Sequence, residues 1–207
     1  MSTSRVKVKI CGLSRKQDVD FVNQLLPDYA GFVFAESRRR VSVAEAERMA
    51  QDLAPAMKKV GVFVNAPPSF VQDAAVRCNL DILQFHGRET SAYWQSFSKP
   101  IWKALRIRDQ SALIQTADFN GIEALLLDSE RGGSGRTFDW RLVKGLELPY
   151  PLILAGGLNP DNVLQAIAAV RPFAVDVSSG VETDGIKDFH KIQLFIEKVR
   201  GSYEYSI

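Results

Sequence analysis

The stretch Val6-Lys-Val-Lys-Ile-Cys-Gly-Leu13, followed directly by Ser14-Arg-Lys-Gln17, decides the fold. Its first part is a short run rich in Val, Ile and Leu, as expected of a strand buried on both faces of a parallel sheet. Its second part has the Ser-x-x-Gln pattern of a capping box, in which two side chains satisfy the free amides of a first helical turn. The stretch therefore predicts a strand that leads straight into a helix.

The same alternation continues along the whole chain. Further apolar runs occupy Tyr29–Phe34, Lys59–Val64, Ile82–His86, Ile101–Ile107, Ala124–Asp128, Leu152–Gly157 and Ala174–Ser179. Helix-length segments separate them, one of which begins at a second capping box, Ser42-Val-Ala-Glu45. The segment after the sixth run is weak, because only Phe138–Lys144 can form a helix there. Eight such units predict an α/β fold, a single-domain (β/α)8 TIM barrel over residues 1–207, rather than an open doubly wound sheet of about six strands.

Composition narrows the class of protein. The 207 residues are 46% hydrophobic and 24% charged, which is ordinary for a globular domain. A net charge of +2 gives no reason to expect a nucleic acid or an acidic membrane surface as partner. Two cysteines are too few for a disulfide scaffold or a four-ligand zinc site, and no run is long enough to span a bilayer. We therefore expect a cytoplasmic protein that acts on a small molecule.

Small residues follow the last two predicted strands, where the active site of such a barrel lies. They are Gly156, Gly157, Ser178, Ser179 and Gly180. Because small residues let backbone amides approach an anion closely, they predict a phosphate-binding site rather than mere tight turns. The glycine-rich segment 132–135 after the sixth run either hinges a lid or is a connection without a role.

Reactive side chains stand at other strand ends. Cys11 closes the first run, which favours a reactive thiol over a small buried one. Asp128 follows a buried run, and a carboxylate there is costly unless it faces a polar site or caps the next loop. His86 ends the fourth run and either binds substrate or satisfies core polar groups. The arginines Arg38–Arg40 form either a solvated face or a clamp for a second anion.

Motifs spread along the chain resemble those of the phosphoribosylanthranilate isomerase family. They are Lys9-Ile-Cys-Gly-Leu13, Gly31-Phe-Val-Phe34 with Ser37-x-Arg39, Val60-Gly-Val-Phe-Val-Asn65, Gln84-Phe-His-Gly87, Leu127-Asp128, Gly132-Gly-Ser-Gly-x-Thr-Phe-Asp-Trp140, Ala155-Gly-Gly-Leu158 and Val175-Asp-Val-Ser-Ser-Gly-Val-Glu182. They occur in order from the first strand to the eighth and cover nearly the whole chain.

The resemblance implies an Amadori rearrangement in tryptophan biosynthesis, without a cofactor or metal. N-(5'-phosphoribosyl)anthranilate opens its ribose ring and isomerises to 1-(o-carboxyphenylamino)-1-deoxyribulose 5-phosphate. Asp128 is implied to be the general acid at the ring oxygen, and Cys11 the base at C2'. For these roles the pKa of Asp128 must be raised, by burial or a negative neighbour, and positive charge must stabilise the Cys11 thiolate.

Further roles follow from the same resemblance. Arg39 is implied to hold the anthranilate carboxylate, with Arg40 as the alternative in a run of three arginines. Asp176 either binds ribose or is structural, and Lys9 supports the site from within its strand. Apart from the resemblance, we expect a monomer because the sequence shows no obvious extra apolar patch, and we expect that it binds neither nucleic acid nor membrane.

Three other functions compete with this one. A histidine-pathway isomerase performs the same chemistry but resembles a two-aspartate site, so Cys11 argues against it. An indole-forming lyase would need lysine and glutamate catalysts that the strand ends do not display. A non-catalytic sensor of a phosphorylated ligand would not need Cys11 and Asp128 together.

Overall fold

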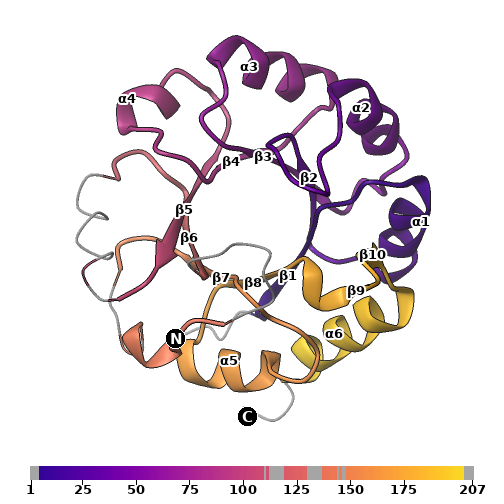
Figure 1. Cartoon of the computed structure of the whole chain (residues 1–207), viewed down its shortest axis with the longest axis vertical. Coiled ribbons are helices and arrows are strands. Elements are labelled where there is room, and N and C mark those ends of the chain that lie inside the picture. Colours follow the sequence, from indigo (N-terminus) through magenta and orange to yellow (C-terminus); the bar gives the residue numbers. More distant parts are fainter. Residues whose placement is uncertain are drawn as a thin grey trace.

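Eight parallel strands form a closed ring in the computed structural model, which describes residues 5–109, 111, 119–129, 137–143, 145 and 148–202 (Figure 1). The strands are β1 (Lys7–Cys11), β2 (Tyr29–Val33), β3 (Lys58–Phe63), β4 (Ile82–Phe85), β5 (Ile101–Ile107), β6 (Ala124–Ser129), β7 (Leu152–Leu154) and β8 (Ala174–Val177). Each strand overlaps one of the predicted apolar runs, so all eight predicted strands are confirmed. β7 and β8 end early because glycine and serine loops begin there.

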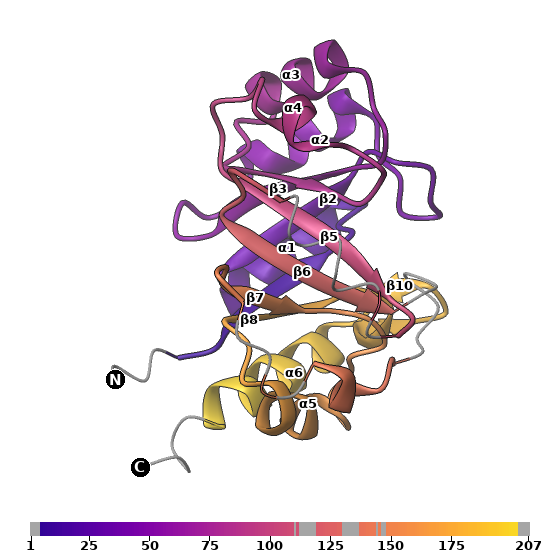
Figure 2. The same ribbon diagram turned by 90° about the vertical axis from the view of Figure 1, so that its left-hand side faces the viewer.

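Pairing between the first and last strands closes the barrel. Lys9 of β1 lies opposite Tyr29 of β2 on one side and Asp176 of β8 on the other. An open doubly wound sheet would leave two strand edges unpaired, so this pairing excludes it. The arrows of β5 and β6 run toward the side of the barrel where the hairpin of β9 (Glu182–Thr183) and β10 (Ile186–Lys187) lies (Figure 2).

Helices cover the outside of the ring. They are α1 (Lys16–Leu25), α2 (Val43–Gln51), α3 (Pro68–Arg77), α4 (Ser91–Trp94), α5 (Val163–Val170) and α6 (Phe189–Gly201). Between β4 and β7 the structure describes the single turn α4 and the 3-10 helix η2 (Trp140–Leu142), and residues 112–118, between β5 and β6, lie outside the described residues. The short η2 agrees with the weak pattern of residues 138–144. Among the described residues, no helix is long and apolar enough to cross a bilayer.

One predicted capping box is confirmed and the other is wrong. At α2 the Ser42 hydroxyl accepts from the Glu45 amide at 3.2 Å, and the Glu45 carboxylate accepts from the Ser42 amide at 2.8 Å. At α1 the predicted pair with Gln17 does not form. Asp18 instead accepts from the amides of Ser14 at 3.0 Å and of Arg15 at 3.1 Å, because a charged carboxylate outcompetes an amide oxygen for them.

The interior of the barrel changes character along its axis. One end is filled by apolar side chains, namely Tyr29, Val60, Ile82, Trp102, Ala104, Ala124, Leu126, Ile153, Ala155 and Ala174. Alternate residues of a strand face the same side, so the residues that lie two positions further toward the carboxyl end of each strand also point into the barrel. The polar ones are Lys9, Cys11, Gln84, His86, Arg106, Asp128, Asp176 and Ser178, while β2 and β3 contribute Val33 and Val62. The packed end supports a polar cavity at the other end.

Candidate active site

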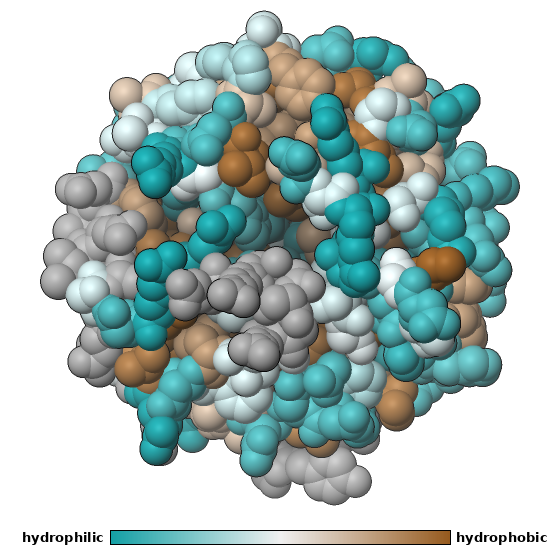
Figure 3. Space-filling model, viewed as in Figure 1, coloured by the Kyte–Doolittle hydropathy of each residue, from teal (hydrophilic) through white to brown (hydrophobic). Residues whose placement is uncertain are grey.

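The predicted site residues meet in one cavity at the carboxyl ends of the strands, with a volume of about 200 Å³. Its lining includes Cys11, Arg39, His86, Asp128, Gly156, Gly157, Asp176, Ser178 and Ser179. Gly180 is the one predicted site residue outside this lining. Figure 3 shows the hollow at the centre of the ring, with hydrophilic residues gathered around it.

Asp128 is buried near the end of β6, where its carboxylate accepts a 2.7 Å hydrogen bond from the Ser129 amide. A Cβ at position 156 would lie 2.9 Å from the carboxylate, so Gly156 makes room for it. Burial, together with the negative charge of Asp176, raises the pKa of Asp128 to about 6, against the opposing effects of the Ser129 amide and Arg106. About one tenth of the molecules then carry a protonated Asp128 at pH 7. This agrees with the expectation for an acid.

Cys11 is buried at the end of β1, beside Gly31 of β2. A Cβ at position 31 would stand 3.1 Å from the Cys11 sulfur, so glycine leaves space for the thiol. The expected positive charge is present, because Lys9 lowers the pKa of the thiol and Lys187 adds to this. Burial outweighs both and holds the pKa above its ordinary value. The expected stabilisation of the thiolate is therefore not achieved in the free protein.

Asp176 forms an ion pair inside the barrel rather than a surface contact. Both of its carboxylate oxygens lie 3.1 Å from the Lys9 ammonium, and both side chains are buried. The pair spans the closing seam between β1 and β8. Since Asp176 also lines the cavity, the structure allows it to touch a ligand as well as to hold Lys9.

Arg39 stands in a dense cluster of charge. Its Nε and Nη2 donate to the Glu182 carboxylate at 2.6 and 2.8 Å. Arg38 and Lys187 each donate to the same carboxylate at 2.7 Å, so one anion faces three cations. An excess of positive charge at the edge of the cavity favours an anionic ligand group. Arg40 is exposed and does not line the cavity, which favours Arg39 as the residue that binds a carboxylate.

His86 lines the cavity as a neutral side chain. Burial and the nearby cations Lys9, Lys103 and Arg106 lower its pKa to about 3. One of its ring nitrogens, Nε2, contacts the amide nitrogen of Gln84. If the amide donates there, the ring's other nitrogen carries the proton and is a donor. Gln84 Oε1 is buried and accepts no hydrogen bond from the described residues, which leaves it able to accept one from a ligand.

The predicted phosphate loops lie side by side. Gly156 and Gly157 both have positive φ, +83° and +66°, in the left-handed region that other residues enter only at a cost. On the neighbouring loop the Ser178 hydroxyl donates to the Cys11 carbonyl at 3.0 Å and so ties this loop to β1.

Gly180 lies where the loop after β8 packs against the loop after β7. A side chain there would overlap the Leu158 carbonyl, so the residue lets the loops after β7 and β8 touch. Gly180 does not line the cavity, and its place in the phosphate site stays a prediction. Its neighbour Ser179 does line it and begins the 3-10 helix η3 (Ser179–Val181).

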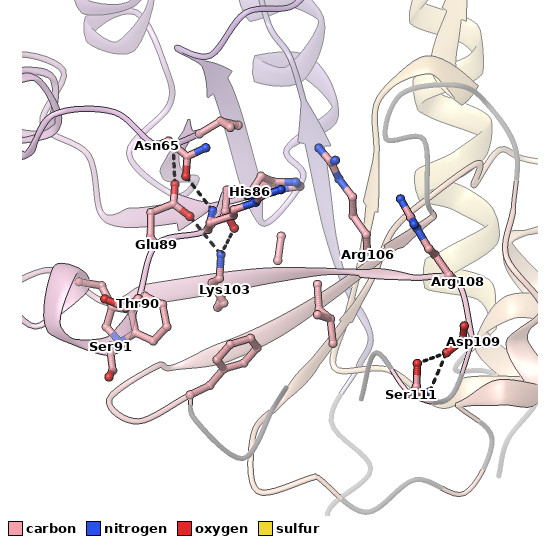
Figure 4. Close-up of a pocket in the computed structure, with 17 residues that line it drawn as sticks. Asn65, His86, Glu89, Thr90, Ser91, Lys103, Arg106, Arg108, Asp109 and Ser111 are labelled. Carbon is pink, nitrogen blue, oxygen red and sulfur yellow. Dashed lines mark hydrogen bonds and ion pairs between the residues drawn. The ribbon is translucent and has the colours of Figure 1, made fainter. Parts of the chain in front are cut away.

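A larger cavity of about 700 Å³ adjoins the site along β4 and β5. Its floor is the buried pair of Lys103 and Glu89, 3.1 Å apart, and Lys103 also donates to the Gly87 carbonyl at 2.7 Å (Figure 4). His86 and Arg106 line both cavities. Within the described part of the chain, no group of three or more His, Cys, Asp or Glu could hold a metal ion. The glycine-rich segment 132–135 lies outside the described residues.

The sequence alone predicts no role for Gln84, Glu182 or Lys187. Gln84 could have been found from its spacing, because it precedes His86 by two residues and must face the same side of the strand. Glu182 and Lys187 lie on the hairpin after β8 and act on Arg39, 143 residues from Glu182, so no local pattern reveals them.

Comparison with known proteins gives one consistent family. A model described as N-(5'-phosphoribosyl)anthranilate (PRA) isomerase matches residues 8–198. The N-(5'-phosphoribosyl)anthranilate isomerase of Thermoanaerobacter pseudethanolicus is 52% identical over 201 residues, which cover 95% of this chain and 98% of the relative.

Solved structures give the same result. The phosphoribosyl anthranilate isomerase of Thermotoga maritima is 40% identical, with a TM-score of 0.85, and covers 95% of this chain and 99% of its own. Another, solved in complex with reduced 1-(o-carboxyphenylamino)-1-deoxyribulose 5-phosphate, is 38% identical with a TM-score of 0.83 and the same coverage. The chain therefore belongs to the N-(5'-phosphoribosyl)anthranilate isomerase family.

Proposed function

We propose that the barrel isomerises N-(5'-phosphoribosyl)anthranilate to 1-(o-carboxyphenylamino)-1-deoxyribulose 5-phosphate, with Asp128 as general acid and Cys11 as general base. The observation that carries these roles is that a carboxyl with a raised pKa and a buried thiol line one cavity. A shift of a proton from one carbon of a sugar to its neighbour needs an acid and a base positioned in this way.

Asp128 acts in the first step. Its carboxyl group donates a proton to the ribose ring oxygen as the bond between that oxygen and C1' breaks. The nitrogen lone pair forms the C1'=N bond, which leaves an open-chain iminium ion and a hydroxyl group. The raised pKa of Asp128 keeps a protonated fraction available at neutral pH, which supports this role.

Cys11 acts in the second step. Its thiolate removes the proton from C2', and the electron pair of that C–H bond forms the C1'=C2' double bond. The π electrons of C1'=N return to nitrogen, so the positive charge disappears and an enolamine results. Tautomerisation of the enolamine to the C2' ketone completes the isomerisation, with a proton added at C1'.

The remaining residues hold the two anionic ends of the substrate and its hydroxyl groups. The loops of Gly156–Gly157 and Ser178–Ser179 suit a phosphate, since neither carries a bulky side chain. The excess of positive charge around Arg39 suits the anthranilate carboxylate. We assign ribose hydroxyl groups to Asp176 and His86, which line the cavity between these ends.

Several features of this proposal go beyond the site itself. We propose that the reaction needs no cofactor or metal, and that the protein acts as a monomer in the cytoplasm. Size-exclusion chromatography with light scattering measures the oligomeric state. Turnover after exhaustive dialysis against a chelator, compared with turnover in added metal, tests the need for a metal ion.

Loss of substrate fluorescence tests the reaction and its residues together. Freshly made N-(5'-phosphoribosyl)anthranilate is mixed with the wild-type protein, Cys11→Ala and Asp128→Asn. We expect fast turnover by the wild type and a fall in kcat of about 10³-fold or more in each variant. Cys78→Ala, which removes the other buried thiol, is the matched control and should leave kcat unchanged.

Three results would overturn parts of the proposal. No turnover by folded wild-type protein would reject the isomerase activity. Turnover of only the corresponding histidine-pathway precursor would reassign the substrate, and full activity of both variants would reject the acid and base assignments while leaving the activity in place.

A further inference from the structure

Lys9 is a buried cation that the proposed steps do not use. Its side chain is fully buried inside the barrel, and its ammonium lies 3.1 Å from both oxygens of Asp176. A charge in such a place is costly unless it is compensated on all sides. Apolar residues of similar size could fill the space, so the cost calls for a physical reason.

The ammonium lies between two groups that can carry negative charge. Lys9 and Cys11 are two residues apart on β1 and therefore face the same side of the strand. The Lys9 side chain and the Cys11 sulfur lie beside the same point of β2, because a Cβ at Gly31 would stand 3.2 Å from Lys9 Cε and 3.1 Å from the sulfur. One cation thus serves a permanent carboxylate and a thiol that must ionise to act as a base.

Other charged or titratable groups lie around this trio. They are Asp128 on β6, Arg106 on β5, His86 after β4, Arg39 after β2, Lys187 on β10 and Glu182 on β9. Lys187 also acts on Cys11, but its ammonium donates to Glu182 at 2.7 Å and to the Ser178 carbonyl at 3.0 Å. Lys187 shares that carboxylate with Arg38 and Arg39, and its effect on the pKa of Cys11 is smaller than that of Lys9. His86 is neutral.

We propose that Lys9 is a positioning residue that compensates Asp176 in the free enzyme and the Cys11 thiolate during turnover. In the free enzyme the ammonium pairs with Asp176, and Cys11 stays a neutral thiol. When substrate hydroxyl groups donate to Asp176, the hold of that carboxylate on Lys9 weakens. The thiol proton then passes to solvent, and the thiolate left behind pairs with the ammonium. This inference rests on the proposed function of Cys11 as base.

The balance of forces on the thiol agrees with this exchange. Burial raises the pKa of Cys11, Lys9 lowers it, and the charge of Asp176 raises it again. Removing the Asp176 charge while keeping Lys9 leaves the lysine acting on the thiol alone. The pKa of Cys11 should therefore fall when Asp176 is neutralised, but only if Lys9 is present.

The test measures the thiol directly, without turnover. All variants carry Cys78→Ala, so that iodoacetamide reports on Cys11, and the alkylation rate is followed from pH 6 to 11. We expect Asp176→Asn to lower the alkylation pKa by about one unit or more, a tenfold rise in thiolate fraction. The neutral pair Lys9→Met with Asp176→Asn should abolish that fall.

A matched control is available in the same barrel. Glu89→Gln frees Lys103, another buried lysine paired with a carboxylate at 3.1 Å, which is not among the groups that shift the pKa of Cys11. It should leave the alkylation pKa unchanged. Asp176→Ser removes the same charge with a smaller side chain and provides a second comparison if Asp176→Asn does not fold. Thermal unfolding of each variant verifies the fold.

The outcomes separate this inference from the proposed function. An equal alkylation pKa in Asp176→Asn and in the neutral pair would show that Lys9 serves Asp176 alone, and would overturn the inference even if the wild type turns over substrate. The predicted pKa pattern in a protein that does not isomerise the substrate would support the electrostatic coupling and reject the function on which its catalytic meaning rests.

Discussion

The two ends of the barrel interior are built by the same strands and have opposite chemistry. At the amino ends of the strands the interior is apolar, and the rings of Tyr29 and Trp102 meet edge to face at 4.8 Å. Two to four residues further along, the inward positions carry Cys11, Asp128 and Asp176. The packed end needs only volume and shape, whereas the polar end keeps charges that burial makes costly.

The contrast shows where stability and activity are separated in this fold. Substitutions at the packed end should change the free energy of unfolding and leave chemistry intact. Substitutions at the polar end should do the reverse, and some should even stabilise the protein, because functional sites retain groups that folding alone would not select.

Trp102→Ala is the substitution expected to have the largest effect on stability. It removes a fully buried ring from the packed end and leaves a cavity, which should lower the free energy of unfolding by about 3 to 5 kcal/mol. The kcat of the folded fraction should stay close to the wild-type value. Denaturant unfolding and steady-state kinetics at low temperature test both. Trp102→Phe is the control, because the indole N–H has no partner among the described residues and little is lost with it.

Asp128→Asn, at the polar end, should raise the free energy of unfolding, whereas Trp102→Ala lowers it. The pKa of Asp128 is about 6 in the folded protein and near its ordinary value of 3.8 when unfolded, so ionisation favours unfolding. The loss of stability grows as pH rises from about 4 to 6 and is complete above that. The free energy of unfolding of the variant should therefore exceed that of the wild type by about 1 to 3 kcal/mol at pH 8, and the two values should be equal below pH 4. Lower stability of the variant at pH 8 would contradict this account.

Glu182→Gln should affect substrate binding more than chemistry. The carboxylate orients Arg39 through two hydrogen bonds, and an amide cannot accept both with the same strength. We expect KM to rise about tenfold while kcat stays within about twofold. Arg38→Ala, which removes the outer partner of the same carboxylate, should change KM little because Arg38 is exposed. An equal fall in kcat and kcat/KM for Glu182→Gln would place its effect in the transition state instead.

Ser42→Ala should have the smallest effect on stability, and it provides a reference for the larger effects. The serine caps α2 on the outside of the barrel, so its loss should cost about 1 kcal/mol and leave kcat and KM unchanged. Ser14→Ala is the matched control, since Asp18 rather than a Ser14 capping box holds the start of α1. Thermal melts of the two variants should differ accordingly, and an equal loss in both would contradict the cap assignment.

Strand order and the positions of Cys11 and Asp128 were predictable from sequence, because burial on both faces gives each strand an apolar run and the site follows its end. The charge state of Cys11 was not, since it depends on how burial balances Lys9 and Asp176. The Glu182 cluster and the packing of Gly180 on Leu158 also escaped prediction, because each joins segments with no shared local pattern.

The pairing of β1 with β8 has a consequence for the order of events in folding. Lys9 and Asp176 are separated by 167 residues, and the Ser178 hydroxyl reaches the Cys11 carbonyl across the same seam. A nascent chain therefore holds Lys9 without its counter-charge, Asp176, until the last strand of the barrel has been synthesised and docked. The arrangement of Cys11, Lys9 and Asp176 is complete only when β8 pairs with β1. The alkylation rate of Cys11 during refolding should therefore report when the barrel closes.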